Sequence, residues 1–553
     1  MKLRKSLGAT IVLLLLLVAI SVSACSFSLS DDDLTEGQAR EKLKALASRV
    51  KVTHSDPQPN NSWVGTEGSL DELPDIETKY PLSVMGNGRV DVEIFSSTEK
   101  ASKDGSGWLD IQAKKFNDSS RSLSIRPIAS GAAVGYITTG TYVPGAYTPS
   151  NVLWAEMLRS KGVQAVEVTE SLVGNTAGIL MKPETYEAFT DQYGNVTMES
   201  VVKAILEDNL VLAQTDPNIS STGLNVMTQQ LLVFDSKNPF SETSRTQMQA
   251  LTNRIPPVSP TTAEMVKVAS SGLADAIISE YQSWQSDPQL KDWVFTPVGV
   301  RHDSPLYAFD SDLTDEQLLV LEEFAEFCKT EAAQAEASLL GFNPKDGYVG
   351  VPNTLWGQEL YTALEFWKQN KDGGKAVLSI FVADRSGSMD GEPLAQLKSS
   401  LLNGSNYIND QYYVGLVSFA SDVSIDVPID RFDARQHSLF YGAVEALHAD
   451  GGTATNDALV VAMDMLVKKQ EELGLDDAKL RVFLLSDGMQ NEGFSLAQVR
   501  GVINGLNIPI YTIGYNAEIA DLEELSSMNE AYFTPAESGD VIMKIKELFT
   551  AQL

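Results

Sequence analysis

Three short segments in the last third of the chain carry carboxylate and hydroxyl side chains at spacings that suit a metal ion. In residues 384–388, Asp-Arg-Ser-Gly-Ser, alternate positions supply one carboxylate and two hydroxyls. A Gly-Gly-Thr-Ala-Thr loop at 451–455 supplies a third hydroxyl, and Asp487, followed by Gly488, supplies a second carboxylate. Oxygen donors of this kind are the ligands that Mg²⁺ and Ca²⁺ prefer in proteins. The sequence therefore predicts one metal site with these ligands: Asp384, Ser386, Ser388, Thr453 and Asp487.

The elements around these segments predict that the five side chains meet at one edge of a sheet. Residues 376–384 and 481–487 are largely apolar strand patterns, and each ends in aspartate. From residue 376 to the C-terminus, strand and helix patterns alternate, which is typical of a doubly wound α/β sheet. Because such sheets bind ligands beyond the carboxyl ends of their strands, we expect the metal site at that edge.

The three segments together resemble a known type of site. The DxSxS segment, the GGTxT loop and the strand-ending Ser-Asp-Gly, in this order and on these elements, resemble the metal-ion-dependent adhesion site of von Willebrand factor type A (VWA) domains. The resemblance implies a Rossmann-like VWA domain at 375–553, in which Ser386 and Ser388 bind the ion directly and one carboxylate often acts through water. Each residue alone could instead be a helix cap or a solvent-facing side chain. That alternative does not account for all five in the same order.

The donor set indicates which ion and which partner the site would take. Two carboxylates only balance the charge of a divalent ion, so a coordination position remains that a carboxylate from a partner can fill. Magnesium fits the small octahedral set best, whereas calcium prefers more carboxylates; manganese and calcium stay open. The predicted partner is a protein or peptide that offers a carboxylate, which is adhesion chemistry rather than hydrolysis.

The N-terminus predicts export and lipid anchoring. Three basic residues within the first five positions precede an apolar run at 11–20, as in a signal peptide. The sequence Val22-Ser23-Ala24-Cys25 resembles the lipobox of bacterial lipoproteins, which implies a signal peptide at 1–24, lipidation of Cys25 and a location on the outer face of the bacterial cytoplasmic membrane. An uncleaved anchor is the alternative, but the stretch from Thr10 to Ala24 falls short of the roughly 20 residues that span a bilayer.

Residues 25–89 are polar and interrupted by prolines, which predicts a lipid-anchored flexible tether with one short helix near residues 36–50. With Cys25 lipidated, Cys328 is left without a partner for a disulfide within the chain. Cys328 falls in a helical pattern, so we expect it in a hydrophobic core.

Residues 90–369 alternate strand and helix patterns, which predicts a parallel α/β arrangement. They loosely resemble extracellular solute-binding proteins of the type 2 periplasmic fold, which implies two α/β lobes with a ligand cleft between them. Helix starts in such a cleft offer free NH groups to a small solute, although ordinary capping explains each polar residue equally well. The candidate cleft residues are Ser97, Thr98, Ser130, Gly131, Ser221, Thr222 and Tyr281.

Composition narrows the functions. With 42 Lys and Arg against 74 Asp and Glu, the net charge of -32 disfavours nucleic acid as a partner and leaves the lipid anchor as the only expected membrane contact. The four histidines lack metal-ligand spacing and there is no HExxH, GxSxG or P-loop, so we expect no enzyme. The combination resembles substrate-binding and VWA fusion lipoproteins of Gram-positive-type bacteria. The first hypothesis is metal-dependent capture of a partner, and the alternative is a solute receptor for transport or sensing.

Overall fold

The computed structural model describes residues 34–62, 73, 75–256, 258, 259, 262, 265–271, 274–309, 313–345, 347–406, 408–488, 490–515, 520–528 and 533–536. The predicted signal peptide, the predicted lipidation site Cys25 and the last residues of the predicted VWA domain, 537–553, lie outside these residues. Within the described part of the chain, no helix combines the length and the apolar character needed to cross a membrane.

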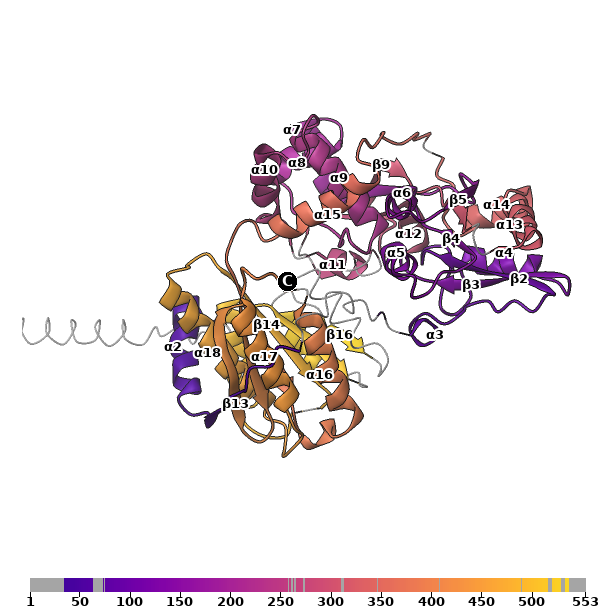
Figure 1. Cartoon of the computed structure of the whole chain (residues 1–553). Helices are drawn as coiled ribbons and strands as arrows, with labels where there is room; N and C mark the ends of the chain where they lie inside the picture. The colour runs from indigo at the N-terminus through magenta and orange to yellow at the C-terminus, as the bar shows by residue number, and fades with distance from the viewer. Residues whose placement is uncertain are drawn as a thin grey trace, which may run out of the picture.

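The C-terminal domain is built on a seven-stranded sheet with the order β1-β13-β12-β11-β14-β15-β16 (Figure 1). Only the β12–β13 pair is antiparallel. The central strands β11 and β14 are rich in Val, Leu, Ile and Phe, and all of their apolar residues except the partly buried Leu480 are buried, as expected for strands covered on both faces. The strands after β1 are β11 (Val377–Asp384), β12 (Tyr413–Phe419), β13 (Val423–Arg431), β14 (Lys479–Ser486), β15 (Ile510–Tyr515) and β16 (Phe533–Ala536).

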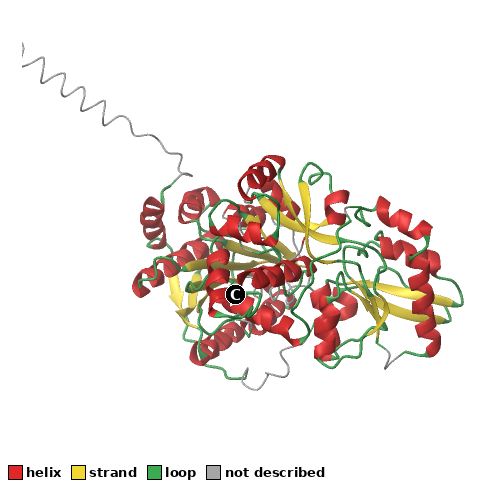
Figure 2. Cartoon of the chain, turned by 90° about the horizontal axis from the view of Figure 1, so that it is seen from above, coloured by secondary structure: helices red, strands yellow, loops and turns green. Residues whose placement is uncertain are grey.

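Helices cover both faces of this sheet (Figure 2). One face packs against α16 (Glu392–Ser405) and α17 (Ala434–Ala446). The other packs against α18 (Thr455–Leu473), α19 (Leu496–Leu506) and α20 (Ala520–Met528). The predicted doubly wound architecture is therefore confirmed.

The N-terminal segment is part of this domain, so the prediction of a flexible tether is wrong for the described residues from 34 to 62. Helix α2 (Glu36–Ala47) packs on α18 and α19, and Leu43 and Leu46 are buried in the same core cluster as the sheet. Strand β1 (Val52–His54) pairs in parallel with the edge strand β13. The polar composition concealed a single apolar stripe on the helix, and that stripe is buried against helices encoded some 400 residues later.

We expect Leu43→Ala to lower the free energy of unfolding of the C-terminal domain by about 2–5 kcal/mol, because Leu43 is 1% exposed and its loss leaves a cavity under α2. Chemical denaturation followed by fluorescence measures the change. Lys44→Ala, at an exposed position of the same helix, is the control and should shift stability by under about 0.5 kcal/mol. If both variants behave alike, α2 does not pack on the domain.

His437, on α17, predicts a pH dependence of this domain. Burial lowers the pKa of His437 to about 4, and its Nε2 lies 2.9 Å from Ser405 Oγ. Between pH 6.5 and pH 4 the unfolded chain takes up a proton that the folded chain does not, so stability falls as the pH falls through this window, by at most about 3 kcal/mol. Denaturation at pH 7 and pH 4.5 should show this loss, and His437→Gln should reduce it. His448→Gln, at an exposed position, should leave the loss unchanged.

The middle region forms two lobes, each with its own sheet, as predicted. The first sheet has the order β3-β2-β4-β10-β5 and the second β7-β8-β6-β9. The expectation of parallel sheets is only partly correct, because β10 is antiparallel to β4 and β5, and β6 is antiparallel to β8 and β9. The strands are β2 (Val90–Ser96), β3 (Arg121–Pro127), β4 (Ala146–Thr148), β5 (Val166–Thr169), β6 (Thr176–Met181), β7 (Leu212–Ala213), β8 (Ala276–Glu280), β9 (Val294–Arg301) and β10 (Leu306–Ala308).

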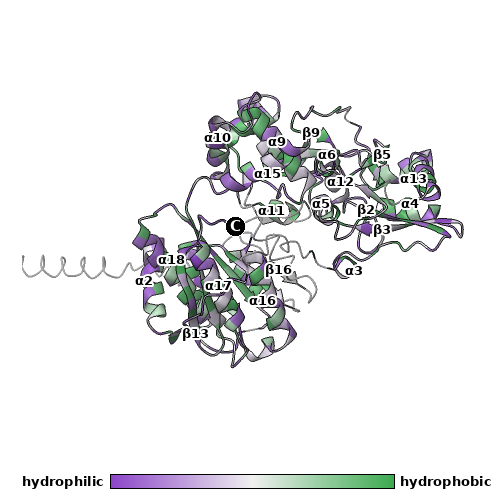
Figure 3. Cartoon of the chain, in the orientation of Figure 1, coloured by the Kyte–Doolittle hydropathy of each residue, from purple (hydrophilic) through white to green (hydrophobic). Residues whose placement is uncertain are grey.

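Helices of the middle region carry green, apolar residues beside purple, polar ones (Figure 3), and buried apolar residues of these helices form the cores around the two sheets. Cys328 ends α13 and is fully buried in the core of the first lobe, as expected, and burial raises the pKa of its thiol. The helices are α3 (Ile76–Lys79), α4 (Trp108–Phe116), α5 (Ser130–Thr139), α6 (Leu153–Ser160), α7 (Pro183–Tyr193), α8 (Met198–Leu206), α9 (Ser221–Phe234), α10 (Glu242–Thr252), α11 (Met265–Ser271), α12 (Tyr281–Ser286), α13 (Asp315–Cys328), α14 (Glu331–Leu339) and α15 (Gln358–Asn370).

Candidate functional site

The five residues predicted as metal ligands lie together beyond the carboxyl ends of β11 and β14. Ser388 Oγ donates a hydrogen bond to Asp487 Oδ1 at 2.8 Å, and the hydroxyls of Ser386 and Ser388 are 3.1 Å apart. Thr453 reaches the same place, because a Cβ built on Gly488 would lie 3.6 Å from Ser388 Oγ and 3.8 Å from Thr453 Oγ1. Three loops separated by up to a hundred residues therefore present two carboxylates and three hydroxyls to one small volume.

Asp384 is the most buried member of the group, with no exposed surface. Its Oδ1 accepts a hydrogen bond of 2.8 Å from the backbone NH of Ser386, and its Oδ2 accepts one of 2.5 Å from Ser486 Oγ. Burial raises the pKa of Asp384, hydrogen bonds from the two serines oppose the rise, and the charge of Asp487 adds to it. A buried carboxylate beside a second carboxylate is the electrostatic setting that a cation stabilises.

The loops are held by contacts that the sequence did not reveal. The NH of Gly387 donates to the carbonyl of Gly451 at 3.0 Å, which joins the first loop to the second. Asn491 Oδ1 accepts a hydrogen bond of 2.9 Å from the NH of Thr453. Ser486, whose hydroxyl fixes Asp384, was within the Ser-Asp-Gly motif but was not singled out; its place directly before Asp487 was the available signal.

No cluster of three or more His, Cys, Asp and Glu side chains suited to a metal occurs among the described residues. The site at Asp384 is consistent with this finding, since its donors are two carboxylates and three hydroxyls. Such a set of hard oxygen donors fits magnesium better than zinc or copper, which prefer nitrogen and sulfur.

A second candidate site is a cavity of about 360 Å³ between the two lobes of the middle region. Ser97 and Ser130 line it from the first lobe, and Ser221 and Glu280 from the second. Four of the seven predicted cleft residues are among those that line it: Ser97, Thr98, Ser130 and Ser221.

The other three predicted cleft residues have structural contacts instead, and none is among the described residues that line the cavity. Gly131 is where the lobes touch: its NH donates to the carbonyl of Ile219 at 3.2 Å, and an added Cβ would lie 2.0 Å from the Asn218 carbonyl oxygen. Thr222 Oγ1 donates to Glu280 at 3.1 Å. Tyr281 packs edge-on against the rings of Trp284 and Phe295.

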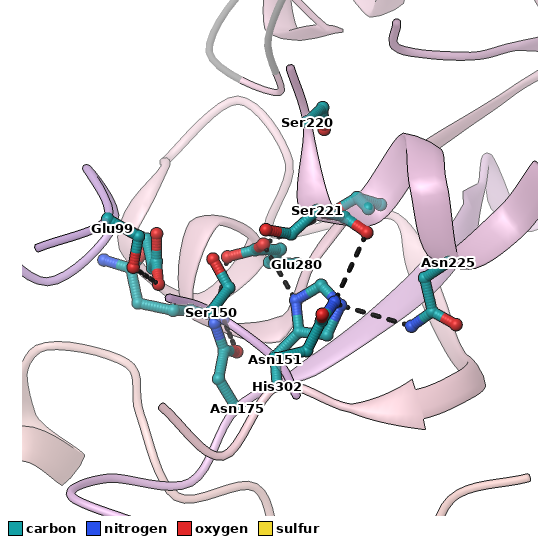
Figure 4. Close-up of polar contacts among 12 residues, drawn as sticks. Glu99, Ser150, Asn151, Asn175, Ser220, Ser221, Asn225, Glu280 and His302 are labelled. Atoms are coloured by element: carbon teal, nitrogen blue, oxygen red, sulfur yellow. Dashed lines mark hydrogen bonds and ion pairs between the residues drawn. The ribbon is translucent and has the colours of Figure 1, made fainter. Parts of the chain in front are cut away.

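A buried polar network contains Glu280, one of the residues that line this cavity (Figure 4). Glu280 Oε1 lies 3.0 Å from His302 Nδ1. The other carboxylate oxygen of Glu280, Oε2, accepts a hydrogen bond of 3.0 Å from the side-chain amide of Asn175. His302 Nε2 is in turn 3.2 Å from the amide of Asn225, on the helix that opens at Ser221. From the sequence, His302 received no role, because the four histidines lack metal-ligand spacing. No local motif connects His302 to Glu280, because the two residues come together from separate strands.

The first lobe contributes a buried ion pair to the same cavity. Lys100 is fully buried and donates to the Thr148 carbonyl at 2.9 Å, to Glu99 at 3.3 Å and to the hydroxyl of Ser97. Burial lowers the pKa of Lys100 and the adjacent Glu99 opposes this. The pair fixes Ser97 at the edge of the cavity.

Comparison with known proteins supports a VWA fold for the C-terminal domain. Residues 380–549 match the model of the von Willebrand factor type A domain family, so the C-terminal domain is a VWA domain. An uncharacterized protein of Synechocystis sp. is 28% identical over 136 residues, which are 24% of this chain and 31% of that protein. Inter-alpha-trypsin inhibitor heavy chain H3 of Homo sapiens is 30% identical over 167 residues, 28% of this chain and 18% of that protein. The chain thus spans a third or less of these relatives.

Three solved structures illustrate the similarities found. A von Willebrand factor type A protein from Catenulispora acidiphila is 19% identical, with a TM-score of 0.29, covering 32% of this chain and 42% of that one. The sulfate-binding protein SubI of Mycobacterium tuberculosis is 14% identical, with a TM-score of 0.34, covering 50% of this chain and 98% of that one. A periplasmic thiamin binding protein is 11% identical, with a TM-score of 0.37, covering 51% and 95%.

Proposed function

We propose that this protein is an exported, lipid-anchored binding protein whose VWA domain captures a protein or peptide through a divalent ion. The observation that carries the proposal is the meeting of Asp384, Ser388 and Asp487, with a 2.8 Å hydrogen bond between the last two. The proposal of lipid anchoring, and of a location on the outer face of the bacterial cytoplasmic membrane, is supported by the resemblance of residues 22–25 to a lipobox. Binding rather than catalysis is proposed because the sequence offers no nucleophile or base motif.

Asp384, Ser386, Ser388, Thr453 and Asp487 would hold the ion, directly or through water. When bound, a divalent ion supplies a Lewis-acidic position that a carboxylate from a partner can fill. The protein's own residues orient the donors: Ser486 and the backbone NH of Ser386 fix the carboxylate of Asp384. Magnesium is the proposed ion, with manganese and calcium as the alternatives for the titration to separate.

The experiment is a titration of the chelator-stripped chain with each ion by calorimetry, followed by binding of an immobilised acidic peptide. One bound ion per chain, and peptide retention that chelator abolishes, support the proposal. A chain that binds no divalent ion contradicts it.

A second function is supported by the cavity between the lobes, where hydroxyls from both lobes face a volume of about 360 Å³. The alternative is therefore a solute receptor in which the middle region binds a small molecule for transport or sensing.

A thermal-shift screen of small polar solutes in chelator tests this. Thr98→Trp, at an exposed residue lining the cavity, should abolish a solute's stabilising effect, and Thr362→Trp, exposed on α15, should not. An effect that survives Thr98→Trp places the solute elsewhere.

A further inference from the structure

A cavity of about 510 Å³ lies where the middle region meets the VWA domain. The second lobe contributes Asn253 and the residues beside it, the VWA sheet contributes Lys479 and Arg481, and the N-terminal helix α2 contributes Arg40. The cavity is at the amino ends of β11 and β14, the opposite edge of the sheet from the Asp384 site. It is therefore distinct from both sites already described.

Basic side chains dominate the charged lining of this cavity. Lys371, Lys375, Lys479 and Arg481 line it, and Glu36 and Asp372 are the acidic residues among the described lining. Arg40 also lines it but is ion-paired with Glu36 at 2.8 Å and with Glu471 at 3.2 Å.

Even when nearby acids are counted, positive charge is in excess. Asp372 Oδ1 is 2.6 Å from Arg481 and 3.8 Å from Lys479 Nζ. The charge of Asp216 also acts on Lys371. With Arg40 included, five basic groups stand against four carboxylates, Glu36, Glu471, Asp372 and Asp216. The local excess is one positive charge, in a chain whose net charge is -32.

Two of these four cations are buried, so water screens them weakly, whereas Lys375 and Lys479 are partly exposed. Lys371 and Arg481 are 8% and 7% exposed. Burial is the main cause that lowers the pKa of Lys371 to about 7 and that of Lys479 to about 8; the charge of Asp372 opposes this fall, and that of Arg481 contributes to it. Buried cations in excess over their acidic partners are stabilised by an anion.

The linker between the two domains, residues 370–375, forms one wall of the cavity. It makes hydrogen bonds to both domains. Gln249 donates to the side chain of Asn370 at 2.9 Å, and Asn253 donates to the carbonyl of Gly373 at 3.1 Å. On the other side Asp372 binds Arg481. An anion in the cavity would contact a linker already attached to both domains.

We propose that this junction cavity binds a small oxyanion of the phosphate and sulfate class, held by Lys371, Lys375, Lys479 and Arg481. The negative charge of such an anion offsets the local excess of positive charge, and a compact tetrahedral anion can accept hydrogen bonds from several of these donors at once. Because the donors come from the linker and from the VWA sheet, a bound oxyanion fixes the two domains relative to one another.

The test is calorimetric titration of the full chain with inorganic phosphate, with sulfate and with a phosphate monoester, each in chelator and at constant ionic strength set with chloride. Saturable binding of phosphate and sulfate is expected. Binding of the monoester as well shows that the oxyanion can be part of a larger molecule, whereas its exclusion assigns the cavity to the free ion.

Lys375→Gln combined with Lys479→Gln should weaken binding at least about tenfold, since both side chains line the cavity and neither is fully buried. Lys468→Gln, an exposed lysine on α18, is the matched control and should bind as the unmodified chain does. A double variant that is folded by circular dichroism and binds phosphate normally overturns the proposal, as does the absence of saturable binding to the unmodified chain.

Discussion

Replacing Asp384 with alanine is expected to abolish divalent-ion binding and, with it, capture of an acidic partner. Asp384 is fully buried at the end of β11 and supplies one of the two carboxylates of the site. Its loss leaves a single carboxylate to balance a divalent charge, and we expect ion affinity to fall by at least about a hundredfold. Calorimetry measures ion binding, and retention on an acidic peptide measures capture.

The matched control is Asp390→Ala, which removes an exposed carboxylate from the same loop. The control should bind the ion as the unmodified chain does. Because removing a buried carboxylate relieves a desolvation cost, Asp384→Ala should remain folded without metal. An Asp384→Ala chain that still binds one magnesium ion would show that the ligands are elsewhere.

Asp372→Asn is expected to destabilise the junction of the two domains strongly. Burial alone would raise the pKa of Asp372, but Arg481, Lys371 and Lys479 hold it below its usual range. The carboxylate also accepts a hydrogen bond from the hydroxyl of Tyr412. Removing one partner of a buried charge pair leaves the other uncompensated, which costs about 3–5 kcal/mol.

Urea denaturation should therefore show a lower midpoint for Asp372→Asn with little change in the slope. Asp477→Asn is the control, because Asp477 is exposed two residues before the strand that carries Lys479 and Arg481. Equal midpoints for the two variants would mean that Asp372 does not stabilise the junction. Addition of phosphate to Asp372→Asn should recover part of the loss, since an anion can replace the missing charge.

The meeting of the five predicted ligands at one edge of the sheet could be predicted from the sequence, because each segment that carries them is a local pattern. Asp384, Ser386 and Ser388 occupy alternate positions of one turn, and Asp487 ends a clearly apolar strand. The doubly wound pattern then determines that these turns share an edge of the sheet. Ser486 and Asn491 escaped notice because their role depends on hydrogen bonds across loops, which no spacing encodes.

The N-terminal segment and the cleft were harder to predict for a different reason. Helix α2 has a weak apolar stripe, and its burial depends on α18 and α19, far away in sequence. In the cleft, Gly131 looked like part of a ligand-binding turn, yet its lack of a side chain lets the Asn218 carbonyl of the other lobe approach. Composition shows that a segment is polar, but it does not show which distant part of the chain that segment packs against.

The pairing of β1 with β13 has a consequence for how the chain folds. Val52 lies beside Val423, so the VWA sheet is completed only by residues that are synthesised before and after the entire middle region. The middle region is thus inserted between two parts of the VWA domain. It can fold as a unit before α2 and β1 pack on that domain. Contacts of such long sequence separation form slowly, because the entropy of closing the loop must be overcome first. We expect refolding to proceed in two phases, with the middle region first and docking of the N-terminal segment last.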